Sequence, residues 1–102
     1  MLTSKVIGQN GQELRSKVLL HPGEVLEEEL EARDLKKSVF AMDLKIYPSH
    51  FSNILKGKRD INAAIALKLE KALDISAEFW VQLQAEYDLK LERQRLQNEK
   101  IA

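Results

Sequence analysis

Polar side chains that can bond nucleobases are spaced along one side of the segment from Pro48 to Lys56. At about 100° per residue, Phe51, Ile54 and Leu55 fall on one side of a helix and the small polar residues fall on the other. The polar residues expected to contact bases are Ser49, His50, Ser52 and Asn53. Asn can bond adenine through two hydrogen bonds, and Ser or His can reach other base edges. We therefore expect this side to lie in the DNA major groove.

Cationic residues surround this polar side. From Leu35 to Arg59 there are six cations and one acid, which gives a net charge of +5 in a chain whose total is zero. The six cations are expected to contact backbone phosphates: Lys36, Lys37, Lys45, Lys56, Lys58 and Arg59. The alternative interpretation is a solvated helical hairpin whose lysines only keep it soluble.

Two short helices with a tight turn between them position these residues. Apolar side chains at helical spacing line the first helix: Phe40, Ala41 and Leu44. Residues 45–47 are too few for anything but a tight turn. Pro48 suits the first position of the second helix because its φ is already helical, and Gly57 suits the residue that ends it.

Length and composition favour one all-α domain. The chain has 102 residues, with only four Gly and two Pro. It contains no apolar run of about eighteen residues and no charged-then-apolar leader, so we expect a soluble, cytoplasmic protein with no membrane segment. Cysteine is absent, which excludes disulfides and thiol chemistry.

Acidic segments flank the cationic one. Residues 23–34 carry a net charge of −5 and residues 60–88 a net charge of −4. We therefore expect one face to contact DNA and the acidic faces to be available to another partner.

The chain is expected to divide into three parts. Residues 1–20 form an N-terminal arm, a small hairpin around Asn10-Gly11 or an extra helical turn. Residues 21–91 form the helical domain. Residues 92–102 are polar all round and should fray or continue as an exposed helical tail.

The first helix of the domain is expected to begin at His21-Pro22-Gly23-Glu24, with Val25, Leu26 and Leu30 inward. His21 invites a metal interpretation, but the chain has one other histidine and no thiol, so we expect a role in starting or packing the helix. The glutamates that follow have no second catalytic group beside them. We therefore expect no catalytic residue, no cofactor and no metal, and no enzyme.

Two more helices are expected after the cationic segment. Asn62 should cap a helix over residues 63–73, whose expected inward residues are Ile65, Leu69, Ala72 and Leu73. Ser76 should cap a last helix with an aromatic stripe, and the residues expected at a dimer interface are Phe79, Trp80, Leu83 and Tyr87. The alternative is that this stripe covers the first helix within the same chain.

Three segments resemble one known family: HPGEVLEEEL from His21, FSNILKGKRDINAAIALKLEKAL from Phe51, and SAEFWVQLQAEYDL from Ser76. From His21 to about Leu89, two thirds of the chain, the sequence is similar to the HigA-type antitoxins. These plasmid-maintenance antidote proteins belong to the phage-repressor-like (lambda repressor-like) helix-turn-helix superfamily. The front HPGE and the final EFW and YDL are the most specific parts of the match.

The resemblance implies a five-helix DNA-binding domain that forms a homodimer and binds a palindromic operator in double-stranded DNA of its own promoter. It also implies a partner, a small basic RelE-like toxin that cleaves messenger RNA. The sequence departs from the superfamily at Lys37, where a glutamine is usual, and at Lys45, where a turn glycine is common. A non-glycine residue at 45 is expected to strain the turn. The alternative function is a helix-turn-helix regulator without a toxin partner.

Overall fold

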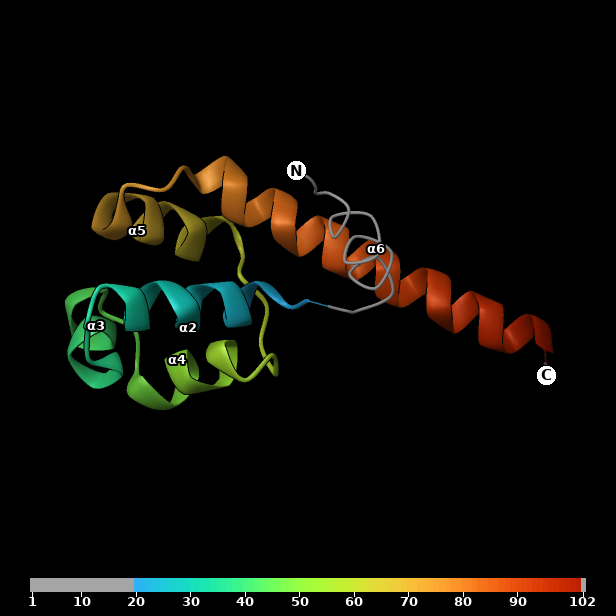
Figure 1. Ribbon diagram of the computed structural model, residues 1–102, viewed down its shortest axis with the longest axis horizontal. Coiled ribbons are helices and arrows are strands. Elements are labelled where there is room, and N and C mark those ends of the chain that lie inside the picture. The colour runs from blue at the N-terminus through green and yellow to red at the C-terminus, as the bar shows by residue number, and fades with distance from the viewer. Residues whose placement is uncertain (1–19, 102) are drawn as a thin grey trace, which may run out of the picture.

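The computed structural model describes residues 20–101 and confirms an all-α fold in that part of the chain (Figure 1). Its helices are α2 (Pro22–Ala32), α3 (Lys37–Asp43), α4 (Pro48–Leu55), α5 (Ala63–Leu73) and α6 (Ala77–Ile101). The arm or hairpin predicted for residues 1–20 lies outside the described residues, apart from Leu20. Within residues 20–101, no helix combines the length and the apolar character needed to cross a membrane.

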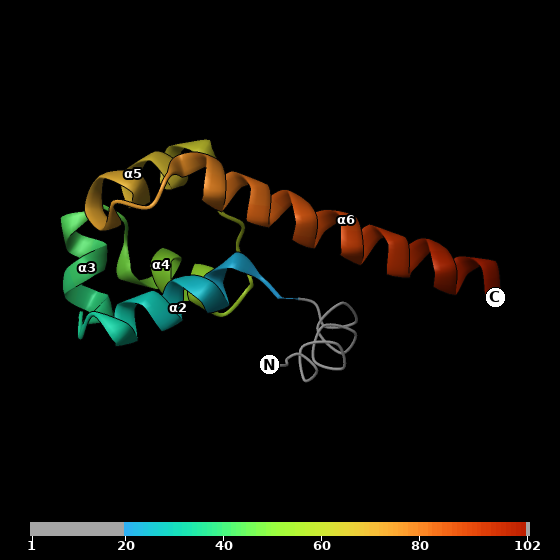
Figure 2. The same cartoon turned by 45° about the horizontal axis from the view of Figure 1, so that its top comes forward.

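Helix α2 runs through the middle of the domain. Figure 1 shows α5 and the start of α6 on one side of it, α4 on the other and α3 at its C-terminal end. Figure 2 shows the later turns of α6 extending away from the other helices. The α3–α4 hairpin and the α5–α6 pair are therefore held on opposite sides of one central helix.

The core takes side chains from each of the helices α2 to α6. Phe51 and Ile54 of α4 pack with Leu26 and Leu30 of α2, and all four are at most 1% exposed. Helices α5 and α6 contribute Ile65, Ala66, Leu69, Leu73 and Trp80. The prediction for Ala72 is wrong, since it is exposed while Ala66 is buried. At about 100° per residue, Ala66 lies about 20° from Leu73 around the helix, whereas Ala72 lies about 100° from it, at the edge of the buried stripe.

Side-chain acceptors cap three helices. His21 confirms its predicted structural role, because its buried ring accepts the Gly23 N–H at Nδ1 over 2.9 Å. Asn62 Oδ1 accepts the Ile65 N–H at 2.9 Å, and Ser76 Oγ accepts the Phe79 N–H at 3.1 Å. Each cap satisfies a backbone donor that the helix itself leaves unpaired.

Gly23 allows α2 and α4 to approach closely. A Cβ atom on Gly23 would lie 1.9 Å from the carbonyl oxygen of Ile54, far inside contact distance. The backbones of α2 and α4 therefore meet at this point, which fixes how α4 sits on the domain.

Trp80 belongs to the protomer core, so its predicted place in a dimer interface is wrong. Its side chain is 0% exposed and meets the Phe79 ring edge-on, with ring centroids 5.1 Å apart. The neighbouring Gln84 is also buried, where its Oε1 accepts the Ile61 N–H at 2.8 Å and its Nε2 donates to Asp88 at 3.0 Å. These contacts attach the first half of α6 to the domain.

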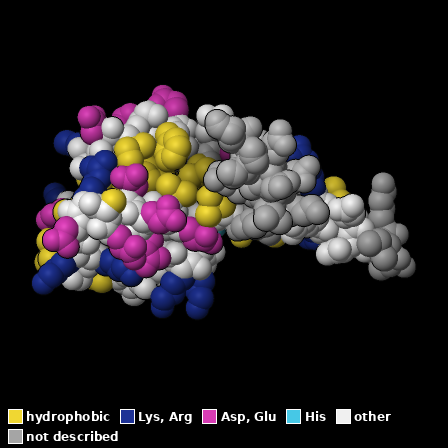
Figure 3. Space-filling view, viewed as in Figure 1, with side chains coloured by type: hydrophobic (Ala, Val, Ile, Leu, Met, Phe, Trp, Pro, Cys, Tyr) yellow, Lys and Arg dark blue, Asp and Glu magenta, His cyan; other side chains and the backbone are white. Residues whose placement is uncertain are grey.

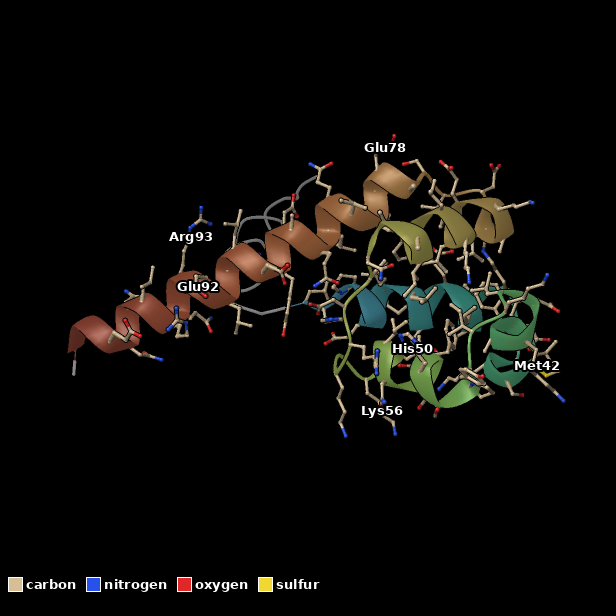
Figure 4. The ribbon with its side chains drawn as sticks, turned by 180° about the vertical axis from the view of Figure 1, so that it is seen from behind. Met42, His50, Lys56, Glu78, Glu92 and Arg93 are labelled. Carbon is tan, nitrogen blue, oxygen red and sulfur yellow. The ribbon has the colours of Figure 1, made fainter. Side chains whose placement is uncertain are left out.

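The second half of α6 is exposed. Leu89, Leu91 and Leu96 are 52%, 44% and 51% exposed. Figure 4 shows Glu92 and Arg93 on the part of α6 that extends beyond the other helices. The helical alternative for the tail is thus the one observed, up to Ile101.

Candidate nucleic-acid interface

Helix α4 has one buried and one polar face, as its sequence predicts. Phe51, Ile54 and Leu55 are at most 5% exposed. The four predicted base-contacting residues share the other side, with Ser49 exposed and the rest half-buried: His50, Ser52 and Asn53. The structure therefore brings these four side chains together on one helix, with no bulky apolar side chain among them.

The turn before α4 is closed by two backbone hydrogen bonds. The Ile46 N–H donates to the Ala41 carbonyl at 2.9 Å, and the Lys45 N–H donates to the Met42 carbonyl at 3.0 Å. Lys45 adopts φ of 61°, the left-handed conformation that usually takes glycine. The strained turn expected at this residue is therefore present, and α3, the turn and α4 form a helix-turn-helix.

The end of α4 turns the chain back along its polar face. Gly57 has φ of 80°, and its N–H donates to the Ile54 carbonyl at 3.1 Å. The backbone N–H groups of Lys58 and Arg59 both donate to the Asn53 carbonyl, at 2.8 and 3.2 Å. Gly57 thus ends the helix as predicted, and the two cations follow directly after the base-facing residues.

Exposed cations lie at the C-terminal end of α4. Lys56, Lys58 and Arg59 are all exposed. Figure 4 shows Lys56 at the end of α4, and Figure 3 shows Lys and Arg side chains along this edge while acidic side chains gather over α2. Arg59 Nη1 also lies 3.4 Å from His50 Nε2, which links this cationic loop to the polar face.

The cations of α3 are in a different environment. Lys36, the residue before α3, is exposed and makes no side-chain cap to the helix. Lys37 Nζ donates to Glu27 Oε2 of α2 at 2.7 Å. This hydrogen bond, with the charge of Glu27, raises the pKa of Lys37. The sequence does not indicate this pair, because its partners lie ten residues apart on different helices.

The remaining residues predicted for a dimer interface keep some exposure. Phe79 is 41% exposed, while Leu83 and Tyr87 are half-buried. The Tyr87 ring meets the buried His21 ring edge-on, with centroids 4.8 Å apart. Tyr87 therefore packs in part within its own chain, in line with the alternative that the aromatic stripe of α6 covers the first helix of the domain.

An apolar surface on α5 and α6 was missed by sequence analysis. Leu67 is 59% exposed and Val81 is 43% exposed. They line a shallow groove together with Ala63, Ala77, Glu78, Gln82 and Ala85. Figure 3 shows this apolar surface over α5 and the start of α6. A signal was available, because Ala77, Val81 and Ala85 recur every four residues beside the buried stripe.

Among the described residues, no group of three or more His, Cys, Asp and Glu side chains is arranged to hold a metal ion. The polar face of α4, with the cations around it, is therefore the candidate site in the described part of the chain.

No protein-family model matches the chain. Virulence-associated protein I of Dichelobacter nodosus is 36% identical over 80 residues, which cover 78% of this chain and 74% of that protein. The structure of an addiction module antidote protein of a HigA family from Coxiella burnetii is 36% identical, has a TM-score of 0.75, and matches over 79% of this chain and 89% of that chain.

A third match was solved with DNA. The structure of Pseudomonas aeruginosa antitoxin HigA with the higBA promoter is 33% identical, with a TM-score of 0.73, and matches over 82% of this chain and 91% of that chain. Sequence identity, coverage of 78–82% of this chain and the same helical fold agree. This chain belongs to the HigA-type antitoxin family of helix-turn-helix proteins.

Proposed function

We propose that this protein is the antitoxin of a toxin–antitoxin pair: it represses its own operon through α4 and neutralises a small basic RelE-like toxin that cleaves messenger RNA. The observation that carries the DNA-binding part is the polar side of α4, which stands opposite a fully buried apolar side and is followed by exposed cations. The promoter-bound Pseudomonas aeruginosa relative supports it.

The division of labour on DNA follows from side-chain chemistry. Ser49, His50, Ser52 and Asn53 contact base edges and specify the sequence. The exposed cations around them contact phosphates, which supply affinity that is independent of sequence and falls with salt. Backbone N–H groups do not compete for this role at the end of α4, since those of Gly57, Lys58 and Arg59 are already bonded to α4 carbonyls.

A second copy of the chain completes the operator-binding unit. Two α4 helices about 34 Å apart would read half-sites one helical turn apart in a palindrome. We place the pairing surface on the apolar groove of Leu67 and Val81 and on the adjoining hollow of Phe79 and Leu83, with Gln82 lining both. The alanines of the groove let another helix approach closely, and large exposed apolar patches are typical of protein interfaces.

The toxin partner is assigned from charge and family. RNA-cleaving toxins are basic because they bind RNA, and the acidic surface of α2 complements such a protein. On α2, the exposed acids are Glu24, Glu28 and Glu31. Figure 3 shows acidic side chains over this helix, while Lys and Arg side chains lie along the edge of the domain that α4 forms.

Mobility-shift titrations test the DNA-binding part. One duplex covers the segment directly upstream of the reading frame, and the other is a scrambled sequence of the same length and composition. We expect tighter binding to the upstream duplex and a fall in affinity for both as salt rises. Equal affinity for the two duplexes would contradict sequence-specific repression.

Co-expression with the neighbouring reading frame tests the antitoxin part. We expect a short cationic protein that arrests growth alone, co-purifies with this chain and is silenced by it. Glu28→Lys with Glu31→Lys should weaken the complex, while Glu99→Lys on the exposed part of α6 should not. If the neighbouring product neither binds nor arrests growth, the chain is a helix-turn-helix regulator without a toxin.

A further inference from the structure

The ion pair between Lys37 and Glu27 places a carboxylate where a DNA phosphate is expected. Lys37 is the first residue of α3, and its Nζ lies 2.7 Å from Glu27 Oε2 on α2. The connection between the two helices makes this possible. It is closed by hydrogen bonds from the Leu35 N–H to the Leu30 carbonyl and from the Asp34 N–H to the Glu31 carbonyl, which turn the chain at the C-terminal end of α2.

We propose that Glu27 competes with DNA phosphates for Lys37 and so lowers the affinity of the protein for random and upstream DNA alike. This inference rests on the proposed function, in which Lys37 contacts a phosphate. Binding to random DNA depends almost entirely on phosphate contacts, whereas operator binding also uses base contacts. The contact that Glu27 withholds is independent of sequence, so its loss lowers both affinities by the same factor.

The pair is placed so that DNA can compete with it. The side chains of Lys37 and Glu27 are 54% and 35% exposed, so both are accessible to solvent. Exposed ion pairs contribute little to stability and are screened by salt. Glu31 adds a second negative charge near Lys37 and acts in the same direction as Glu27. The charge of Lys37 is thus paired with a carboxylate in the free protein, but the pair can open.

The salt dependence of binding is the measurable consequence. While Lys37 stays paired with Glu27, it neutralises no phosphate and releases no counterion from the DNA. Each phosphate contact contributes a slope of about −0.9 to log affinity against log salt. Wild-type protein should therefore show a shallower slope than a variant without Glu27.

The experiment compares Glu27→Gln with Glu28→Gln on a random duplex and on the upstream duplex. Glu28 is the matched control in these titrations, which contain no toxin, because it is an exposed glutamate on the same helix with no ion pair among residues 20–99. We expect Glu27→Gln to steepen the slope by about 0.9, so that its gain in affinity over wild type falls about threefold between about 50 and about 200 mM salt. Glu28→Gln should leave the slope unchanged.

A Lys37→Gln background separates competition from a general charge effect. There, Glu27→Gln should give no more gain than Glu28→Gln. An equal gain with and without Lys37, or an unchanged slope, would overturn the role of Glu27 while leaving DNA binding intact. Failure of wild type and every variant to bind either duplex at low salt would instead overturn the proposed function, and this inference with it.

The pair itself is tested without DNA. Titration of the lysine side chains by NMR should show that Glu27→Gln lowers the pKa of Lys37 towards its ordinary value, while Glu28→Gln does not. An unchanged Lys37 pKa in Glu27→Gln would remove the contact on which the inference depends.

Discussion

The α3–α4 hairpin and the α5–α6 pair contribute to the same core but present different chemistry on their outer sides. Helix α4 buries Phe51 and Ile54 and leaves small polar residues outside. The α5–α6 pair buries Leu69 and Trp80 and leaves Leu67 and other apolar residues outside. A polar outer side suits hydrogen bonds to base edges, and an apolar one suits another protein surface. Burial therefore fixes the fold on both sides of α2, and the outer residues distinguish the roles.

The largest expected effect concerns the core side of α6. Trp80→Ala removes a fully buried side chain and should lower the free energy of unfolding by about 4 kcal/mol. Leu96→Ala, at a residue that is 51% exposed on the same helix, should change it by less than about 0.5 kcal/mol. Urea denaturation of both variants checks this. Similar losses of unfolding free energy in the two variants would show that the first half of α6 does not contribute to the core.

The next effect concerns the outer side of the α5–α6 pair. Leu67→Glu places a charge in the apolar groove and should give a folded monomer by light scattering. Its affinity for the upstream duplex should fall at least about 100-fold, because linked binding of two half-sites is lost. Leu96→Glu, which adds the same charge on the far part of α6, is the control. A Leu67→Glu protein that stays dimeric would exclude the groove as the pairing surface.

The sequence predicted the features that depend on the residues of a single helix. The two faces of α4, the end of that helix at Gly57 and the capping roles of Asn62 and Ser76 all follow from spacing and residue type over a few positions. His21 was likewise expected to start or pack a helix, although its exact bond to the Gly23 N–H was not predicted.

Features that depend on how the helices pack could not be predicted from the sequence. Phe79 and Trp80 are neighbours in one aromatic stripe, and helical periodicity does not say which of them faces the core. The Lys37–Glu27 pair depends on the fold of the α2–α3 connection, so neither residue type nor spacing indicates it. The close approach of Gly23 to Ile54 depends on the same packing of α2 against its neighbours.

The polar side of α4 is tested by a smaller, selective effect. Asn53→Ala should weaken binding to the upstream duplex about 10-fold and leave random DNA almost unchanged, because an amide contact to a base is lost. Lys58→Ala should weaken both duplexes alike and make the salt slope shallower by about one. Among residues 20–101 the Asn53 side chain has no hydrogen-bond partner, so its loss should not disturb the fold. Equal losses on both duplexes for both variants would refute this division.

The smallest expected effect is at the turn that joins α3 to α4. Lys45 holds φ of 61°, and the other non-glycine residues with positive φ are Asp34 and Asp74 in the described part of the chain. Aspartate tolerates this conformation better than lysine, because its short side chain can bond locally. Lys45→Gly should therefore raise the free energy of unfolding by about 1 kcal/mol. Lys45→Gln keeps the Cβ atom and should leave stability unchanged.

Both variants should bind DNA more weakly than the wild type. Both Lys45→Gly and Lys45→Gln remove an exposed cation next to the polar face, so both should weaken every duplex alike and make the salt slope shallower by about one. Urea denaturation and salt titrations on one set of proteins measure the two effects together. A gain in stability with a loss of affinity would mean that the hairpin tolerates a strained turn because the charge is used on DNA. A Lys45→Gly protein with unchanged affinity would remove Lys45 from the DNA-binding surface and leave its strain without a functional cause.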